Sequence, residues 1–355
     1  MAILQVLSPW RATLFTLAVA AAGAMIGTLI SLPAALLTGP ALAVSLAGLA
    51  GLTMDIHPRL RDLAFLVIGV GIGSTVSPET LVVMGQLPLA FLTLLVLLVA
   101  IMLSCQMLLR RGFGYDAQTA VLAAAPGHLS FVIGLSMQEG VDTLSVTVVQ
   151  AVRLLALTLI VPIIAFAMGV EIAGNPLAGQ VMLSLPVFVL LLALSALVGV
   201  LFQRLRLPAA LLIAAMFVSA FGHGGGWVEG GIGPHLGAAC FVTLGALIGT
   251  RFSGMGLAAL RAGFVAGLAI TVLASVLTIL TSLPVAYFLN LDPATVLAAF
   301  APGGFETMIA LGAVLGANPG FIAAAHVARL MFLTGLIPLM LSQAKRSSLG
   351  SPNPS

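Results

Sequence analysis

The chain has 355 residues, of which 61% are hydrophobic and 6% are charged. A soluble domain carries about a quarter charged residues, so this composition excludes a soluble enzyme, a nucleic-acid-binding protein and a disordered regulator. The net charge is +3, and the 13 basic residues form no basic stripe, so nucleic acid is not an expected partner. We expect an all-α polytopic membrane protein in a lipid bilayer, with about ten transmembrane helices of roughly 20 apolar residues each.

Apolar segments predict these crossings in chain order. Segment 12–30 follows a single basic residue, Arg11, and exceeds the length of a signal-peptide core, so we expect a retained first helix. The short polar stretch 345–355 predicts a disordered tail. The predicted crossings are 12–30, 33–52, 61–77, 87–109, 143–168, 181–203, 208–226, 236–250, 262–289 and 319–341.

The sequence repeats itself at an offset of about 176 residues. The matched positions include polar and turn residues, which chance does not place at one offset over so long a stretch. Two homologous repeats are therefore predicted, residues 1–175 and 176–344. The glycine pairs Gly69/Gly73 and Gly245/Gly249 predict closely packed helix faces in both repeats. Other matched positions are Asp116 and Asp292, Pro126-Gly127 and Pro302-Gly303, and Arg153 and Arg329.

Segments 116–142 and 292–318 each contain two short apolar stretches separated by Pro-Gly. Each is either a broken crossing helix or a re-entrant hairpin that enters and leaves on the same side. With hairpins, eleven of the 13 Lys and Arg residues lie on the cytoplasmic side, as the positive-inside rule requires. If these two segments instead crossed the membrane as broken helices, Arg110 and Arg204 would lie on opposite sides of the bilayer. We therefore expect two inverted five-helix repeats, each with a re-entrant helical hairpin, and both termini in the cytoplasm.

Inverted repeats with broken helices near the midplane are typical of secondary transporters. Arg153 and Arg329 each lie about ten residues into a predicted crossing, hence roughly 15 Å deep and near the bilayer centre. An arginine there costs about 2.5–3.5 kcal/mol, so each requires a partner or a function. One interpretation is that both bind an anionic substrate, since a guanidinium matches a carboxylate. The other is that they tether their helices to hairpin carbonyls or to an acid.

The hairpin tips supply the rest of a predicted substrate site. A helix that begins after each Pro-Gly directs free N–H groups and a partial positive charge into the membrane. Tip carbonyls near Ala125 and Ala301 are candidate ligands for a cation such as Na⁺. The alternative is a tight turn that only lines a water-filled vestibule. The predicted substrate-binding residues are Arg153, Arg329, Pro126, Gly127, His128, Ser130, Pro302, Gly303, Gly304, Glu306 and Thr307.

Three residues beside the arginines and the second tip are candidates for ion coupling. Glu306 either caps its helix, pairs with Arg329 or Arg153, or binds a coupling proton. His326, three residues before Arg329, is either a titratable coupling group or a packed, hydrogen-bonded histidine. Gln150 occupies the equivalent position before Arg153.

The sequence contains no pattern that predicts an enzyme. Its five histidines show no metal-ligand spacing. The run from His223 to Gly226 lacks the G-x-S-x-G motif that a hydrolase would add. Cys105 and Cys240 lie inside apolar runs and are interpreted as buried thiols. We expect no catalytic residue, no bound metal and no cofactor.

The doubled tip motif resembles the AbrB family of bacterial integral membrane proteins. The motif is Ala125-Pro-Gly-His128 with Gln150-x-x-Arg153, and Ala301-Pro-Gly-Gly304 with His326-x-x-Arg329. The resemblance covers nearly the whole chain and implies a multi-pass protein of the bacterial inner (plasma) membrane. Members carry the labels ammonia monooxygenase or regulator of gene expression. A monooxygenase needs clustered metal ligands and a regulator needs a soluble effector domain, and the sequence shows neither.

The expected function is secondary transport of a small organic anion, most simply a carboxylate, by alternating access. H⁺ or Na⁺ is the expected coupling ion. A channel and a membrane-embedded regulator of gene expression are the alternatives, and the sequence leaves a homodimer open.

Overall fold

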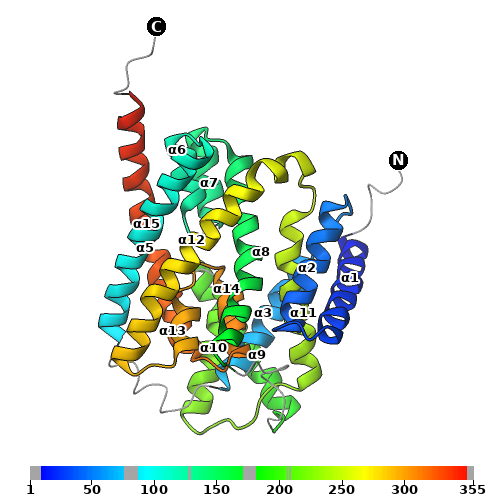
Figure 1. Cartoon of the computed structure of the whole chain (residues 1–355). Helices are drawn as coiled ribbons and strands as arrows, with labels where there is room; N and C mark the ends of the chain where they lie inside the picture. The colour runs from blue at the N-terminus through cyan, green and yellow to red at the C-terminus, as the bar shows by residue number, and fades with distance from the viewer. Residues whose placement is uncertain are drawn as a thin grey trace.

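The computed structural model describes residues 9–75, 87–126, 129–170, 181–205, 207 and 209–349, and this part of the chain is built from helices with no β-strand (Figure 1). The first half contains α1 (Pro9–Leu29), α2 (Ala35–Leu49), α3 (Pro58–Gly73), α5 (Leu87–Phe113), α6 (Ala117–Ala124), α7 (Leu129–Glu139) and α8 (Thr143–Ala167). The second half contains α9 (Leu185–Arg204), α10 (Ala210–Gly224), α11 (Pro234–Gly249), the 3₁₀ turn η2 (Thr250–Phe252), α12 (Leu257–Leu289), α13 (Pro293–Phe300), α14 (Phe305–Val314) and α15 (Pro319–Leu349).

Each of the ten predicted crossings coincides with a helix. Seven of the described helices are long and apolar enough to cross a membrane: α1, α5, α8, α9, α11 with η2, α12 and α15. The helices α2 and α10 are apolar but shorter, with 15 residues each. The prediction of an all-helical polytopic membrane protein is therefore confirmed, and the exact number of crossings stays a prediction.

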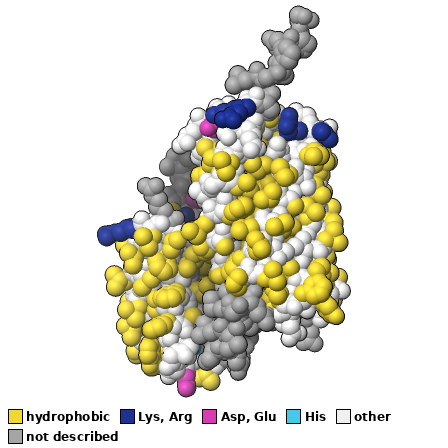
Figure 2. Space-filling view, turned by 90° about the vertical axis from the view of Figure 1, so that its left-hand side faces the viewer, with side chains coloured by type: hydrophobic (Ala, Val, Ile, Leu, Met, Phe, Trp, Pro, Cys, Tyr) yellow, Lys and Arg dark blue, Asp and Glu magenta, His cyan; other side chains and the backbone are white. Residues whose placement is uncertain are grey.

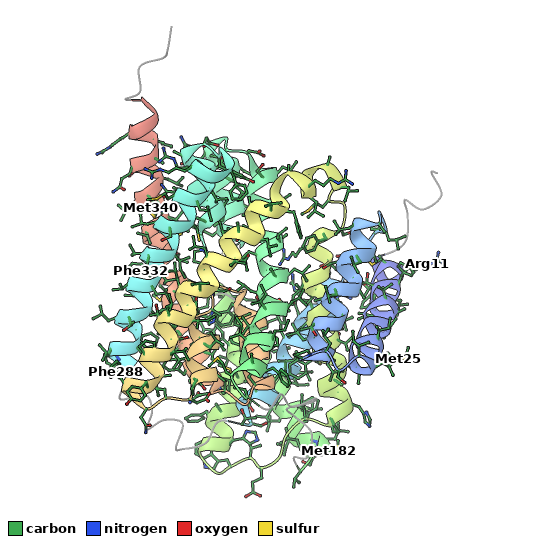
Figure 3. All side chains as sticks on the ribbon, in the orientation of Figure 1. Arg11, Met25, Met182, Phe288, Phe332 and Met340 are labelled. Carbon is green, nitrogen blue, oxygen red and sulfur yellow. The ribbon has the colours of Figure 1, made fainter. Side chains whose placement is uncertain are left out.

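Large apolar side chains point outward around the perimeter. Met25 on α1 is 62% exposed and Phe288 on α12 is 79% exposed, and both project away from their helices (Figure 3). Apolar side chains cover most of the face shown in Figure 2, and Lys and Arg side chains lie at its upper edges. A water-exposed surface of this kind would promote aggregation, whereas lipid tails accommodate it.

Two pairs of short helices lie where the sequence predicts hairpins. The first hairpin is α6–α7 and the second is α13–α14. Ala125 and Ala301, which end α6 and α13, have extended backbone because the residue before a proline avoids the α conformation. Asp116 and Asp292 cap the two hairpins at their start. Figure 1 shows α6 and α7 in the upper part of the molecule, and α13 in the lower part beside the end of α12.

The helices form two groups. The first helix group contains α1, α2, α3, α9, α10 and α11, and the second contains α5 to α8 and α12 to α15. Neighbouring helices pack extensively within each group, whereas the groups meet mainly where α8 and α14 contact α2, α3 and α11. The two hairpins both belong to the second helix group.

Equivalent helices of the two repeats make equivalent contacts. In the first helix group, α3 packs on α10 and α11 packs on α2, so each repeat supplies one helix to a pair with the other. Gly69 and Gly73 lie against the backbone of α10, and Gly245 and Gly249 lie against that of α2. A Cβ atom at any of these four positions would overlap the facing helix. The predicted close-packed faces are therefore confirmed.

The helix α15 continues to Leu349, so the prediction of a disordered tail from Lys345 onward is wrong for residues 345–349. Lys345 forms an ion pair with Glu139 at the end of α7. This contact joins the last turns of α15 to the first hairpin, which accounts for the extra helix. Residues 350–355 lie outside the described part of the chain.

Candidate functional site

Arg153 on α8 binds the end of the first hairpin helix. Its guanidinium donates to the carbonyls of Ala124 at 3.1 Å and Ala125 at 2.6 Å, and to the side-chain oxygen of Gln150. The amide of Gln150 in turn donates to Ala125 at 2.8 Å and to Leu122 at 3.0 Å. The carbonyls of Ala124 and Ala125 accept no backbone N–H from the described residues because α6 stops at the proline, and Leu122 accepts only that of Ala125. Arg153 and Gln150 therefore replace the turn of helix that Pro126 prevents.

Arg329 on α15 does the same for the second hairpin. Its guanidinium donates to the carbonyls of Ala301 at 2.8 Å and Gly303 at 2.9 Å, and to Nδ1 of His326. Nε2 of His326 lies 3.0 Å from the carbonyl of Ala298. Arg329 and His326 are both completely buried. Nε of Arg329 has no hydrogen-bond partner among the described residues.

The two networks correspond in part at the repeat offset: Ala125 and Ala301 are equivalent acceptors of the arginines, whereas the second acceptor is Ala124 in one and Gly303 in the other. Leu122 and Ala298 are equivalent acceptors, and Gln150 and His326 each donate to them through Nε2 and accept from the arginine. A protonated imidazole would direct a second N–H at a guanidinium, which can only donate. The network therefore requires the neutral Nε2–H form of His326. This geometry fits the interpretation of His326 as a packed histidine.

The arginines also occupy the place predicted for a coupling cation. The carbonyls of Ala125 and Ala301 were candidate ligands for Na⁺, and each accepts a hydrogen bond from a guanidinium instead. Neither Arg153 nor Arg329 forms an ion pair with a carboxylate of the described residues. Two positive charges therefore lie inside the helix bundle, and their hydrogen-bond partners among the described residues are uncharged carbonyls, the Gln150 side chain and the His326 ring.

A cavity of about 530 Å³ lies between the two helix groups. The first helix group lines it with residues of α3, α9, α10 and α11, and the second lines it with α8, α14, α15 and the second tip. Side chains at its open end are Arg61, Asp62, Gln203 and Arg251, and Arg61 pairs with Asp62 at 2.8 Å. The positive-inside rule predicts that this end faces the cytoplasm, and the orientation stays a prediction.

The buried end of the cavity is polar. It is formed by the start of α14 together with Arg153 and Gln150, which are 3% and 4% exposed. Thr307, in the first turn of α14, is 5% exposed, lines the cavity and donates no hydrogen bond to a described residue. Gly304 precedes this turn and packs against Leu154 of α8, where a Cβ atom would overlap the leucine side chain. A glycine here lets the second tip approach Arg153.

A family profile described as "Transition state regulatory protein AbrB" matches residues 36–345, which include both hairpins and both arginines. The chain belongs to the AbrB family. It is also similar to "Uncharacterized protein YhjN" of Bacillus subtilis (strain 168), with 25% identity over 332 residues, covering 89% of this chain and 85% of the relative. The family resemblance drawn from the doubled tip motif is thus confirmed.

The structure of this AbrB-family protein brings most of the predicted second-tip residues together. Residues at one cavity wall include Arg153, Gln150, Pro302, Gly303, Gly304, Glu306 and Thr307. Arg329, His326 and Pro126 are buried and do not line the cavity. Gly127, His128 and the side chain of Ser130 lie outside the described part of the chain. For Arg329 the present geometry favours tethering, and substrate contact by Arg153 stays a prediction.

Sequence reasoning did not identify the residues at the open end of the AbrB-family cavity. Arg61 and Arg251 were predicted only as cytoplasmic charges, and no sequence pattern marked Asp62 or Gln203 as lining a site. The four residues come from α3, α9 and η2, whose meeting is decided by helix packing.

Proposed function

We propose that this AbrB-family protein is an ion-coupled secondary transporter of a small organic anion, a carboxylate, that works by alternating access. The observation that carries the proposal is the cavity between the helix groups, whose buried end combines the start of α14, the Thr307 hydroxyl and Arg153. A helix start offers N–H groups and a partial positive charge to an anion. The unpaired hydroxyl of Thr307 supplies a donor where a carboxylate oxygen would lie.

Charge supports an anion over a cation or a neutral solute. Arg153 lines the cavity, Arg329 lies behind the second tip, and neither is neutralised by a carboxylate of the described residues. Coulombic attraction is strong in a bundle core because little water screens it. An anion entering from the open end therefore gains energy from both guanidiniums, although only Arg153 is accessible to it.

The duplicated architecture supports alternating access. In the proposed inverted arrangement, the two repeats exchange conformations, so the cavity closes at its present opening and forms on the other side. Arg329 would then line the cavity and Arg153 would be occluded. The unpaired Nε of Arg329 is consistent with this exchange, because a buried orphan donor costs about 1–3 kcal/mol and calls for a partner in another state.

Counterflow in proteoliposomes tests the proposal. Vesicles loaded with unlabelled pyruvate, malonate or succinate should take up the same labelled acid faster than protein-free vesicles. Thr307→Val keeps the shape of the side chain and removes the hydroxyl. It should raise KM about ten- to hundredfold, because a hydrogen bond to a charged group contributes about 1.5–3 kcal/mol. Thr278→Val is the matched control, since Thr278 is buried in α12 and bonds only its own helix.

Absence of counterflow for every acid, or an unchanged KM in Thr307→Val, would count against this function. The family description motivates the second candidate, a regulator of gene expression. A regulator that acts without transport predicts normal transcription in cells carrying a variant without counterflow. A transporter that affects genes through its substrate predicts altered transcription in the same cells.

A further inference from the structure

Glu306 has an unusual position for a carboxylate. It lies in the first turn of α14, is partly exposed and lines the same cavity as Arg153. Its side chain makes no hydrogen bond and no ion pair with any described residue. A carboxylate in the first turn of a helix commonly caps the free backbone N–H groups there, and Glu306 does not. Of the three roles that the sequence left open, helix capping and pairing with an arginine are therefore not observed.

The other candidates for ion coupling are already engaged. His326 donates to Ala298 and accepts from Arg329, so protonation would break the network that holds the second tip. The carbonyls of Ala125 and Ala301 accept from guanidiniums, so they are not free to bind Na⁺. Glu306 is the remaining ionisable candidate, and it stands beside the place where the anion would bind.

We propose that the coupling ion is a proton and that Glu306 carries it. The inference rests on the proposed function. Ionised Glu306 and an anionic substrate would compete for the N–H groups of the same helix turn, and two negative charges there would repel each other. Protonation of Glu306 removes the repulsion, so the anion and the proton bind together.

The proton step is a simple exchange with water. At the open cavity, one carboxylate oxygen of Glu306 takes a proton from water, and on the other side of the membrane that O–H bond breaks and the proton returns to water. The charged groups that share the cavity are Arg153 on α8, Arg61 and Asp62 on α3, and Arg251 on η2. Arg61 and Asp62 pair with each other, which leaves Arg153 as the buried cation near Glu306.

This coupling makes a quantitative prediction. One proton moves with each monocarboxylate, so each cycle is electroneutral and responds to a pH gradient but not to membrane potential. At equilibrium the anion should accumulate about tenfold per pH unit of gradient, since a tenfold ratio corresponds to about 1.4 kcal/mol. Replacing Na⁺ by choline should leave uptake unchanged.

The experiment uses labelled pyruvate and the full-length protein in proteoliposomes, with potential clamped by valinomycin and K⁺. Wild type should accumulate pyruvate in response to the pH gradient alone. Glu306→Gln cannot ionise and should lose accumulation driven by the pH gradient, with counterflow measured in parallel as a separate readout. His326→Gln, which copies the Gln150 network of the first half, should keep both. Glu229→Gln is the matched control, because Glu229 is exposed and does not line this cavity.

Two results would overturn the inference while leaving the proposed function intact: accumulation driven by a Na⁺ gradient alone, or full pH-driven accumulation by Glu306→Gln. Loss of pH-driven accumulation in His326→Gln alone would assign the proton to the histidine instead. If wild type shows no counterflow, the proposed function fails and this inference fails with it. If Glu306→Gln does not fold, Glu306→Asp decides: a shifted pH profile supports the inference, and an unchanged one overturns it.

Discussion

The two hairpin tips share one scaffold but present different chemistry. In each, an arginine on the following long helix and a partner three residues earlier bind the carbonyls of the broken helix. Of the tip residues that the structure describes, those of the second tip line the cavity, which they share with Arg153 of the first repeat, while their own Arg329 is buried behind them. Both hairpins thus share the hydrogen bonds from an arginine to Ala125 or Ala301, while the packing of the helix groups leaves the described part of the second tip at the cavity.

The largest expected effect on stability is that of Arg329→Ala. The change leaves the carbonyl of Gly303 and the ring nitrogen of His326 without their donor in a buried place, and leaves Ala301 with only the N–H of Gly303. Removing one partner of a buried charged network costs about 3–5 kcal/mol. Urea unfolding in detergent should show this loss. Native-like stability combined with loss of transport would instead assign Arg329 a role in substrate binding.

Arg153→Ala should cost less stability and more transport. Water can enter the cavity and solvate the carbonyls of Ala124 and Ala125, so we expect a loss of about 1–3 kcal/mol. Counterflow should fall below detection because the accessible cation is gone. Urea unfolding and counterflow, measured for both arginine variants, check whether Arg329 contributes more to stability and Arg153 more to transport. Equal losses of stability would contradict it.

Alanine at Gly69 or Gly245 tests whether the two repeats pack equivalently. Each new methyl group would overlap the facing helix, α10 or α2, so each variant should lose about 1–3 kcal/mol. The two losses should agree, because the glycines are equivalent. Gly335→Ala is the control, since a Cβ there meets nothing within 4 Å, and it should not destabilise the protein. If alanine destabilised the protein at one of the two glycines and not at the other, the two repeats would not pack equivalently.

The smallest effect comes from a pair of equivalent helix caps. Asp142 caps α8 through the backbone N–H of Ser145, and Asn318 caps α15 through that of Phe321. Hydrogen bonds from Ser145 lower the pKa of Asp142 below its ordinary value. The charge therefore stabilises the folded state above the unfolded pKa of about 3.9, and this contribution is lost as pH falls through the lower folded-state value.

Asp142→Asn makes the two caps alike. It should cost about 0.3–1 kcal/mol at neutral pH, through the loss of a negative charge at a helix start. The difference from wild type should vanish in acid, as measured by thermal unfolding over a pH series. A difference that persists below the folded-state pKa would show that the charge is not its source.

The local elements were predictable because their causes are local. Apolar stretches of membrane length form helices, a proline ends α6 and α13, and an aspartate begins each hairpin. The repeat offset also matched Arg153 with Arg329, and each binds a carbonyl at the end of its hairpin helix. The tail was mispredicted at Lys345, because its partner Glu139 is distant in sequence.

The accessible surface was decided by the tertiary structure. Sequence placed both arginines near the midplane, yet only the packing of the two helix groups leaves Arg153 at the cavity and buries Arg329. The same packing brings Arg61 and Arg251 to one opening and leaves the Glu306 side chain without a partner among the described residues. Helix formation and helix breaks depend on neighbouring residues and were readable from the chain, whereas a cavity is the space left between surfaces and depends on how whole helices meet.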